Sequence, residues 1–176
     1  MLGLKYGTVK LVPHNQGWRT AFVEESARLR NALSEVSCEI EHIGSTAVPE
    51  VCAKPILDIA IGLKRGIPIE IVIPAIQRVG YQYRGDAKDA GGHIFVRESD
   101  PQVRSHHVHV VELNGPQWQA YLLLRDFLRN NREGRQTYDT EKQLLAKRYS
   151  DDRKGYTAAK GQVLRRLLAE AERLET

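Results

Sequence analysis

The first part of the chain shows helical spacing of apolar residues, followed by strand spacing on both sides of a Gly44-Ser45 turn. Over residues 18–33, apolar side chains recur at steps of three and four, which is typical of a helix with one buried face. A strand is predicted over 39–43, and the apolar run 56–63 is typical of a strand inside a sheet. Residues 46–53 are expected to form a short helical turn between these two strands.

The middle of the chain is predicted to hold one helix and three strands. Residues 69–79 are helical by their position and by the closing Gly80, although β-branched side chains give them a poor helix propensity. Loops are expected at 85–92 and 99–101. The strands that these loops separate are predicted over 81–84, 93–98 and 104–113. Consecutive strands with short loops imply antiparallel pairing.

The last part of the chain shows helical spacing throughout. Helices are predicted over 117–130, 134–148 and 152–174. The expected fold is α/β (α+β), with a mixed β-sheet, flanking helices and a C-terminal helical layer. At 176 residues the chain is expected to form a single domain, in which 1–116 supply the sheet with its helices and 117–176 the helical part.

Composition and charge narrow the class of protein. No run approaches the roughly 20 apolar residues that span a bilayer, and no secretion signal is visible, so a cytoplasmic protein without a membrane partner is expected. Cys38 and Cys52 lack CxxC spacing and are interpreted as small buried or semi-buried residues. Residues 117–176 hold 13 basic and 9 acidic side chains, which accounts for the whole net charge of +4. These charges are interspersed and no recognition motif appears, so nucleic acid is not the expected partner.

The Gly44-Ser45 turn, together with Asp58, is the first candidate site. A glycine lets backbone N–H groups approach a bound phosphate, and a serine adds a hydroxyl donor. Asp58 is a carboxylate within an apolar strand, where it could hold Mg²⁺ against phosphates. The alternative is a carboxylate that is hydrogen-bonded to the turn or to Lys54.

A histidine-rich strand is the second candidate. Alternation places His107 and His109 on one face and His106 on the other. Two imidazoles on one face can bind a metal, contact phosphate or act as acid and base, whereas plain hydrogen bonding in a polar cleft is the alternative. Arg97 could reach an anion over the same face or form a surface ion pair, and His42 could face either the cleft or another strand.

The C-terminal helices add basic residues at four-residue spacing. Tyr138 and Lys142 form one such pair, and Tyr156 and Lys160 form another. Each pair could clamp an anionic ligand, and each is also typical of an ordinary exposed helix face.

Several motifs along the chain resemble the GrpB family. They are the blocks His42-Ile43-Gly44-Ser45-Thr46-Ala47-Val48-Pro49, Ala53-Lys54-Pro55-Ile56-Leu57-Asp58-Ile59, His106-His107-Val108-His109-Val110, Leu124-Arg125-Asp126-Phe127-Leu128-Arg129, Tyr138 to Lys142 and Tyr156-Thr157-Ala158-Ala159-Lys160. The resemblance extends from about residue 13 to 160. It implies a nucleotidyltransferase-like fold and a relation to the domain fused to dephospho-CoA kinase in some bacteria.

The wider nucleotidyltransferase superfamily implies roles for single residues. In that superfamily a Gly-Ser turn holds phosphates, and two alternating acidic residues on the next strand bind Mg²⁺. A third acidic residue comes from a later strand. This chain keeps Gly44-Ser45 and Asp58, but the second acidic position falls on Ala60, and His107 and His109 stand where a carboxylate might be sought. Ordinary two-metal transfer is therefore in question, and the donors suit a weaker or different metal.

The function expected from the sequence is binding of a nucleotide or another phosphorylated small molecule, with metal-dependent nucleotidyl transfer in a catalytic version. Asp58, His107 and His109 are the expected catalytic and metal-binding residues, with Mg²⁺ or Mn²⁺ as the cofactor. The expected phosphate-binding residues are Gly44, Ser45, Lys54, Arg97, Lys142 and Lys160. The alternative is a noncatalytic module that binds a ligand or a protein partner, and the alanine at position 60 favours it.

Overall fold

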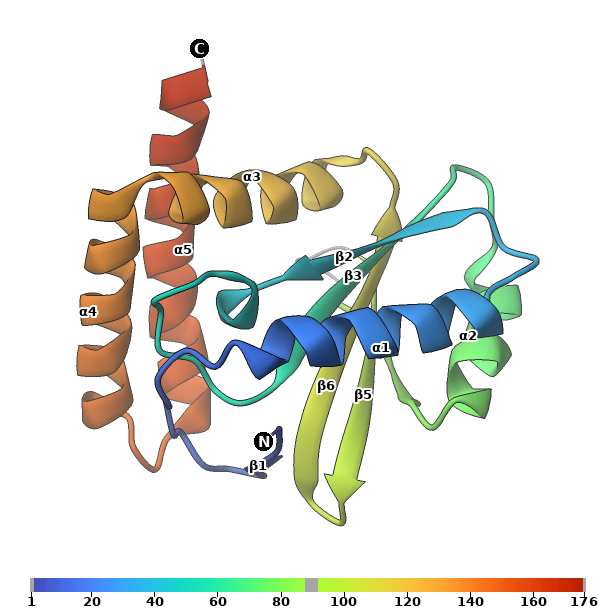
Figure 1. The fold of residues 1–176 in the computed structure, drawn as a ribbon, viewed down its shortest axis with the longest axis horizontal. Helices are drawn as coiled ribbons and strands as arrows, with labels where there is room; N and C mark the ends of the chain where they lie inside the picture. The colour runs from blue at the N-terminus through green and yellow to red at the C-terminus, as the bar shows by residue number, and fades with distance from the viewer. Residues whose placement is uncertain (1, 88–91, 176) are drawn as a thin grey trace.

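A mixed six-stranded sheet with helices on both faces forms the molecule (Figure 1). The computed structural model describes residues 2–87 and 92–175, so part of the predicted 85–92 loop lies outside the described residues. In chain order the elements are β1 (Leu4–Lys5), α1 (Gly17–Ala32), β2 (Cys38–Ile43), the 3₁₀ turn η1 (Ser45–Ala47), β3 (Leu57–Leu63), α2 (Ile69–Arg78), β4 (Gln82–Asp86), β5 (His93–Asp100), β6 (Val103–Glu112), α3 (Pro116–Asn130), α4 (Arg132–Arg148) and α5 (Arg153–Glu175).

The strand order is β2-β3-β6-β5-β4, with β1 added along β6. β3 and β6 run parallel, while every other neighbouring pair is antiparallel. The predicted mixed sheet and the antiparallel pairing of the last three strands are confirmed. Strands β4 and β5 extend to Asp86 and Asp100, so they run further than their patterns predict.

Helices α1 and α2 cover one face of the sheet and form the main core with it. Ile59 and Ile61 of β3 and Val108 of β6 point into this core, where they meet Leu29 of α1 and Ile76 of α2. Burial of these apolar side chains stabilises the layer and overrides the poor local propensity of α2. The alternation that buries the two isoleucines turns Asp58 and Ala60 toward the opposite face.

The C-terminal helices cover part of this opposite face. Trp118 of α3 packs on Ile43 and Ala60, while a separate cluster joins α3, α4 and α5 and includes Leu128, Tyr138 and Leu167. α4 and α5 lie side by side at the edge of the sheet, and α3 runs across α5 toward the end of α4 (Figure 1). The helical layer therefore approaches the sheet along the side that carries Asp58.

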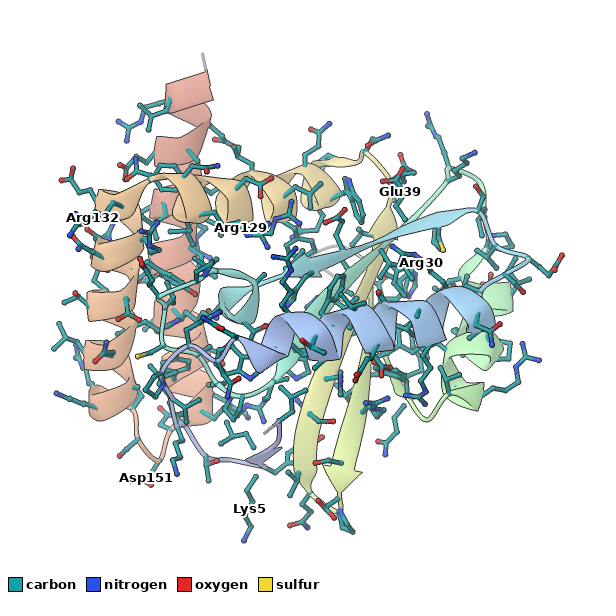
Figure 2. All side chains as sticks on the ribbon, viewed as in Figure 1. Lys5, Arg30, Glu39, Arg129, Arg132 and Asp151 are labelled. Atoms are coloured by element: carbon teal, nitrogen blue, oxygen red, sulfur yellow. The ribbon has the colours of Figure 1, made fainter. Side chains whose placement is uncertain are left out.

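The outer surface of the molecule carries charges of both signs. Exposed side chains such as Arg132 and Asp151 project outward from the helical part, and Arg30 and Glu39 do so from the sheet part (Figure 2). Among the described residues, no helix combines the length and the apolar character that crossing a membrane requires.

Candidate functional site

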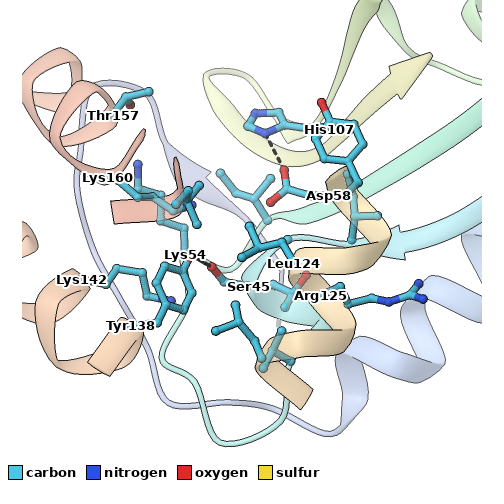
Figure 3. Close-up of a pocket in the computed structure, with 18 of the residues that line it drawn as sticks. Ser45, Lys54, Asp58, His107, Leu124, Arg125, Tyr138, Lys142, Thr157 and Lys160 are labelled. Atoms are coloured by element: carbon cyan, nitrogen blue, oxygen red, sulfur yellow. Dashed lines mark hydrogen bonds and ion pairs between the residues drawn. The ribbon is translucent and has the colours of Figure 1, made fainter. Parts of the chain in front are cut away.

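A pocket of about 670 Å³ lies between the Asp58 face of the sheet and the C-terminal helices (Figure 3). Its walls come from both parts of the chain: the turn after β2, strands β3 and β6, and one side each of α3, α4 and α5. Eight of the nine residues predicted to form the site line it, and these are Gly44, Ser45, Lys54, Asp58, His107, His109, Lys142 and Lys160.

The turn after β2 brings backbone against Asp58. Gly44 adopts φ 69° and ψ −169°, a conformation that side chains with a Cβ rarely take. A Cβ at this position would lie 2.6 Å from Oδ2 of Asp58, so the close approach also requires glycine. The hydroxyls of Ser45 and Tyr138 share a buried hydrogen bond of 2.8 Å, which ties the turn to α4.

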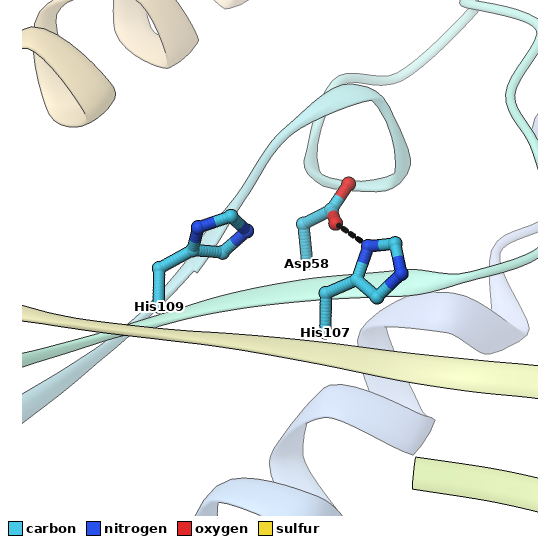
Figure 4. A group of neighbouring side chains, drawn as sticks. All are labelled: Asp58, His107 and His109. Atoms are coloured by element: carbon cyan, nitrogen blue, oxygen red, sulfur yellow. Dashed lines mark hydrogen bonds and ion pairs between the residues drawn. The ribbon is translucent and has the colours of Figure 1, made fainter. Parts of the chain in front are cut away.

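Asp58, His107 and His109 converge at the sheet side of the pocket (Figure 4). The parallel register of β3 and β6 sets Asp58 beside His107 and Ala60 beside His109. One ligand atom from each of the three side chains lies within 4.8 Å of the others. Nδ1 of His107 and Oδ1 of Asp58 share a hydrogen bond of 3.0 Å, and the Tyr121 hydroxyl lies 3.2 Å from Nδ1 of His109.

The surroundings set the charge of this cluster. Burial raises the pKa of Asp58, but the hydrogen bond from His107 and the nearby charges of His107, His109 and Lys160 outweigh burial and hold it at about 2. Burial lowers the pKa of His109 to about 4, although Asp58 acts in the opposite direction. At neutral pH the carboxylate is therefore ionised and His109 is neutral, which are the states that bind metal ions.

Three lysines line the opposite side of the pocket. Burial lowers the pKa of Lys54 to about 8, with help from the charges of Lys160 and Arg153. The Nζ atom of Lys54 lies 4.2 Å from the centre of the Tyr156 ring. Burial opposes the charge on Lys160 too, yet Tyr138, Tyr156 and Asp58 raise its pKa above the ordinary value. Lys160 is therefore a permanent cation in the pocket.

Lys142 differs from the other two lysines. Its side chain is buried, with 1% of the residue exposed, and burial lowers its pKa to about 6. The amine is therefore largely neutral at pH 7. The alternative from the sequence, in which Lys142 belongs to an ordinary exposed helix face, does not agree with this burial. Tyr138 packs against it, with Nζ 4.4 Å from the ring centre.

The pocket is rich in basic side chains and has an apolar wall. Asp58 is the only acidic residue among the described residues that line it, and the basic ones are Lys54, Lys142, Lys160, Arg125, Arg153 and Arg165. Arg125 is already paired with Glu41 of β2 and Asp126. Leu124, Leu164 and Leu168 supply apolar surface from α3 and α5. The arrangement suits a ligand that has an anionic group and an apolar or planar part.

Arg97 lies on the other face of the sheet, so its prediction as a phosphate-binding residue needs correction. It pairs with Glu25 of α1 at 2.7 Å and stands opposite His106 in the register of β5 and β6. Residues that are paired across antiparallel strands share a face, and His106 points away from the pocket. The register of β5 and β6 shifts beside their connecting turn, so alternation within each strand does not by itself separate Arg97 from His107.

His42 also lies away from the pocket, so of the two positions expected for it, facing the cleft is wrong. Its ring stacks on Phe22 of α1, and its Nε2 lies 2.9 Å from the Thr46 hydroxyl. Burial lowers its pKa to about 4. This histidine is a neutral part of the packing beneath α1.

Sequence reasoning missed several pocket residues. Tyr121 contacts His109, and Arg153 and Arg165 add charge from α5. For Arg153 the sequence signal is a helix face that it shares with positions 157, 160, 164 and 168, all of which line the pocket. That spacing becomes informative once the packing of α5 against the sheet is known.

Known proteins similar to this chain share most of its length. The family model for GrpB protein matches residues 8–170. A UPF0157 protein of Pseudomonas aeruginosa is 36% identical over 165 residues, which cover 93% of this chain and 67% of the relative. The glutamate-rich protein GrpB of Alkalihalophilus pseudofirmus is 31% identical over 173 residues, or 97% of this chain and 99% of the relative.

A solved structure shows the same fold. The crystal structure of the conserved protein GrpB from Enterococcus faecalis superposes with a TM-score of 0.78 at 30% identity, covering 92% of this chain and 98% of that one. The similarity therefore includes both the sheet and the helical part that together form the pocket. Sequence motifs, family model and structure agree, and the chain belongs to the GrpB family.

Proposed function

We propose that the pocket binds a nucleotide or another phosphorylated small molecule together with a divalent metal ion. The observation that carries the proposal is the convergence of Asp58, His107 and His109 at one side of a pocket that is also lined by several basic side chains. A metal site beside cationic groups is suited to phosphate chemistry, since both kinds of group stabilise phosphoryl oxygens.

The three side chains fit a divalent metal ion. Ligands that coordinate one metal at about 2.0–2.2 Å lie roughly 3–4 Å apart, so atoms within 4.8 Å need only small side-chain movements. One carboxylate and two imidazoles form a mixed oxygen and nitrogen set, which favours Mn²⁺ or Zn²⁺ over Mg²⁺. Tyr121 fixes the ring of His109 from the second side, as neighbours of metal-binding histidines commonly do.

The remaining groups suit phosphate binding. Lys160 carries a permanent charge into the pocket, and Lys54 is charged at neutral pH with a pKa of about 8. Gly44 leaves the backbone of the turn uncovered by a side chain beside Asp58. In nucleotidyl transfer the metal would supply Lewis-acid polarisation of a phosphoryl group. Lys54 and Lys160 would hold the phosphates, and the apolar wall around Leu124 would hold the base.

A noncatalytic ligand-binding module is the second candidate. Ala60 is fully buried and packs with Ile43, Val111 and Trp118, so the position that would carry a second metal-binding carboxylate is part of the apolar packing. A single carboxylate gives less anionic charge than two-metal transfer ordinarily uses. Binding without group transfer is the outcome that this observation favours.

Thermal melting and calorimetry test the proposal. Purified protein is titrated with Mn²⁺, Zn²⁺ and Mg²⁺, each alone and with a panel of nucleoside triphosphates. We expect Mn²⁺ to bind and to strengthen nucleotide binding, and Asp58→Asn to weaken metal binding by at least about 10-fold because it removes a charged ligand. The matched control is Asp151→Asn at an exposed position, for which we expect no change.

The two candidates are separated by product analysis. Release of pyrophosphate from a bound nucleotide in the presence of Mn²⁺ supports transfer, whereas tight binding without turnover supports the noncatalytic module. Equal metal and nucleotide binding by the Asp58→Asn and Asp151→Asn proteins would contradict the proposed site.

A further inference from the structure

Lys142 is a buried amine that the phosphate-binding role leaves unexplained. It lies on α4 and forms part of the pocket wall, yet its Nζ has no hydrogen-bond partner among the described residues. The side chain lies on the ring of Tyr138, and Figure 3 shows it near Tyr138 at the α4 side of the pocket. Buried charged amines are normally paired, so an unpaired one at a pocket points to a chemical role.

Neighbouring charges distinguish Lys142 from an ordinary lysine. Burial is the main cause that lowers its pKa, and the nearby ammonium of Lys160 lowers it further, while Asp139, Cys52 and Asp58 act in the opposite direction. Lys160 keeps its own proton because Tyr138 and Tyr156 stabilise its charge. The pocket thus holds a neutral amine beside a permanent cation.

This pairing is the arrangement that activates lysine as a nucleophile. A desolvated lysine next to a second cationic group keeps its lone pair free at neutral pH and can attack carbonyl carbon. Two further basic residues of the pocket, Lys54 and Arg153, are available for an anionic group on the same ligand, and Leu164 and Leu168 offer apolar contact. A carbonyl compound that carries a phosphate matches these features.

We propose that Lys142 forms a Schiff base with a phosphorylated aldehyde or ketone bound in the pocket. The lone pair on Nζ attacks the carbonyl carbon, a C–N bond forms, and the carbonyl oxygen takes up a proton to give a carbinolamine. Loss of that oxygen as water, with both protons supplied by the original amine, gives the imine. No metal and no redox partner takes part. The inference rests on the proposed binding of a phosphorylated ligand in this pocket and adds a covalent step to it.

Reductive trapping on the intact protein tests the inference. Pyridoxal 5′-phosphate is the probe because it is a phosphorylated aldehyde, and sodium cyanoborohydride reduces the imine to a stable secondary amine. Peptide mapping then compares Lys142 with Lys147, an exposed lysine on the same helix. At pH 7 we expect label to accumulate at Lys142 at least about 10-fold faster than at Lys147, because burial lowers the pKa of Lys142 to about 6.

Two controls make the result specific to the pocket. Pyridoxal, which lacks the phosphate, is expected to label Lys142 several-fold more slowly, and inorganic pyrophosphate is expected to protect Lys142 but not Lys147. The Lys142→Arg protein keeps a basic side chain but cannot form an imine, whereas Lys147→Arg is the matched variant that keeps the reactive amine.

If Lys142 in the wild-type protein is labelled no faster than Lys147, the proposed Schiff base is overturned. This comparison uses the wild-type protein alone, so it does not depend on whether a variant folds. Fast labelling that persists unchanged at another lysine in the Lys142→Arg protein would overturn it too. A protein that binds Mn²⁺ and nucleotides yet leaves Lys142 unlabelled would remove this inference and leave the proposed function in place.

Discussion

Gly44 and Asp58 lie so close that a Cβ atom on Gly44 would stand 2.6 Å from Oδ2 and 2.9 Å from Cβ of Asp58. The backbone after β2 therefore fills the space beside the carboxylate. Asp58 is held between this backbone and the His107 ring, which sets the direction of its oxygen atoms.

Gly44→Ala is expected to lower the free energy of unfolding by about 2–4 kcal/mol, because it combines an unfavourable backbone conformation with a clash. Urea denaturation measures the change, and Mn²⁺ binding should weaken as Asp58 shifts. The control is Gly66→Ala. Gly66 also has a positive φ, but a Cβ there would have nothing within 4 Å, so we expect a loss of only about 1 kcal/mol in the free energy of unfolding. Equal losses in the two proteins would show that contact with Asp58 has no effect.

Ala60→Asp tests whether a missing carboxylate can simply be restored. Because the position is packed against Trp118 and fully buried, we expect a loss of about 3 kcal/mol or more and no gain of Mg²⁺ binding. Ala27→Asp, on the exposed side of α1, should cost only about 0.5 kcal/mol. A stable Ala60→Asp protein that binds Mg²⁺ would contradict this interpretation of the packing.

Arg97→Met should affect stability and leave the pocket unchanged. Glu25 is nearly buried and accepts hydrogen bonds from Arg97 and from the Tyr81 hydroxyl, so loss of the guanidinium leaves a buried carboxylate undercompensated. Arg97 is partly exposed, and we therefore expect a loss of only about 1–2 kcal/mol. Nucleotide affinity should stay within error, whereas Lys160→Met should reduce it. A lower nucleotide affinity of the Arg97→Met protein with unchanged stability would contradict the placement of Arg97 outside the binding site.

Lys142→Met should stabilise the protein at neutral pH. The unfolded chain holds a proton on this lysine up to about pH 10.5, while the folded pKa is about 6, so stability of the wild type rises with pH between these values. At pH 7 most of the stability lost by burying this amine is still lost. Removing the amine should therefore raise the free energy of unfolding by about 2 kcal/mol or more. The gain should shrink as the pH approaches 10.

Urea denaturation of Lys142→Met at pH 7 and pH 10 provides the measurement. Lys147→Met is the control at an exposed position of the same helix, for which we expect a small effect. A Lys142→Met protein that is less stable than the wild type at pH 7 would mean that the amine is charged and paired in solution.

The Ser45 and Tyr138 hydroxyls can be tested by a double-mutant cycle. Ser45→Ala and Tyr138→Phe should each cost about 1 kcal/mol, since each removes one partner of a buried hydrogen bond. The double variant should cost clearly less than the sum of the two single variants. Additive losses would show that the two hydroxyls do not interact.

Local periodicity predicted most of the fold because each long element here has a repeating apolar face. The helices after residue 116 and the strands with alternating side chains lie where their patterns place them. β1 was missed because Leu4–Lys5 is too short for a repeat and exists through its pairing with β6. The sequence carries no local trace of such a contact.

The candidate site was predictable in its residue types and less so in its geometry. Asp58 meets His107 through a parallel register between strands about 50 residues apart, and a single sequence does not fix that register. Lys142 looked like part of an exposed helix face because burial depends on how α4 packs against α5 and the sheet. Arg97 lies on the other face from the one predicted because the register of β5 and β6 shifts beside their turn, and alternation within each strand does not reveal that shift.

The bond from Ser45 to Tyr138 joins positions that lie 93 residues apart. Lys160, the permanent cation of the pocket, is added later still in chain order. During synthesis the sheet half and its aspartate would emerge long before the helices that close the pocket. A growing chain therefore contains Asp58, His107 and His109 before α5 has been made, and the enclosed pocket exists only when this last helix docks.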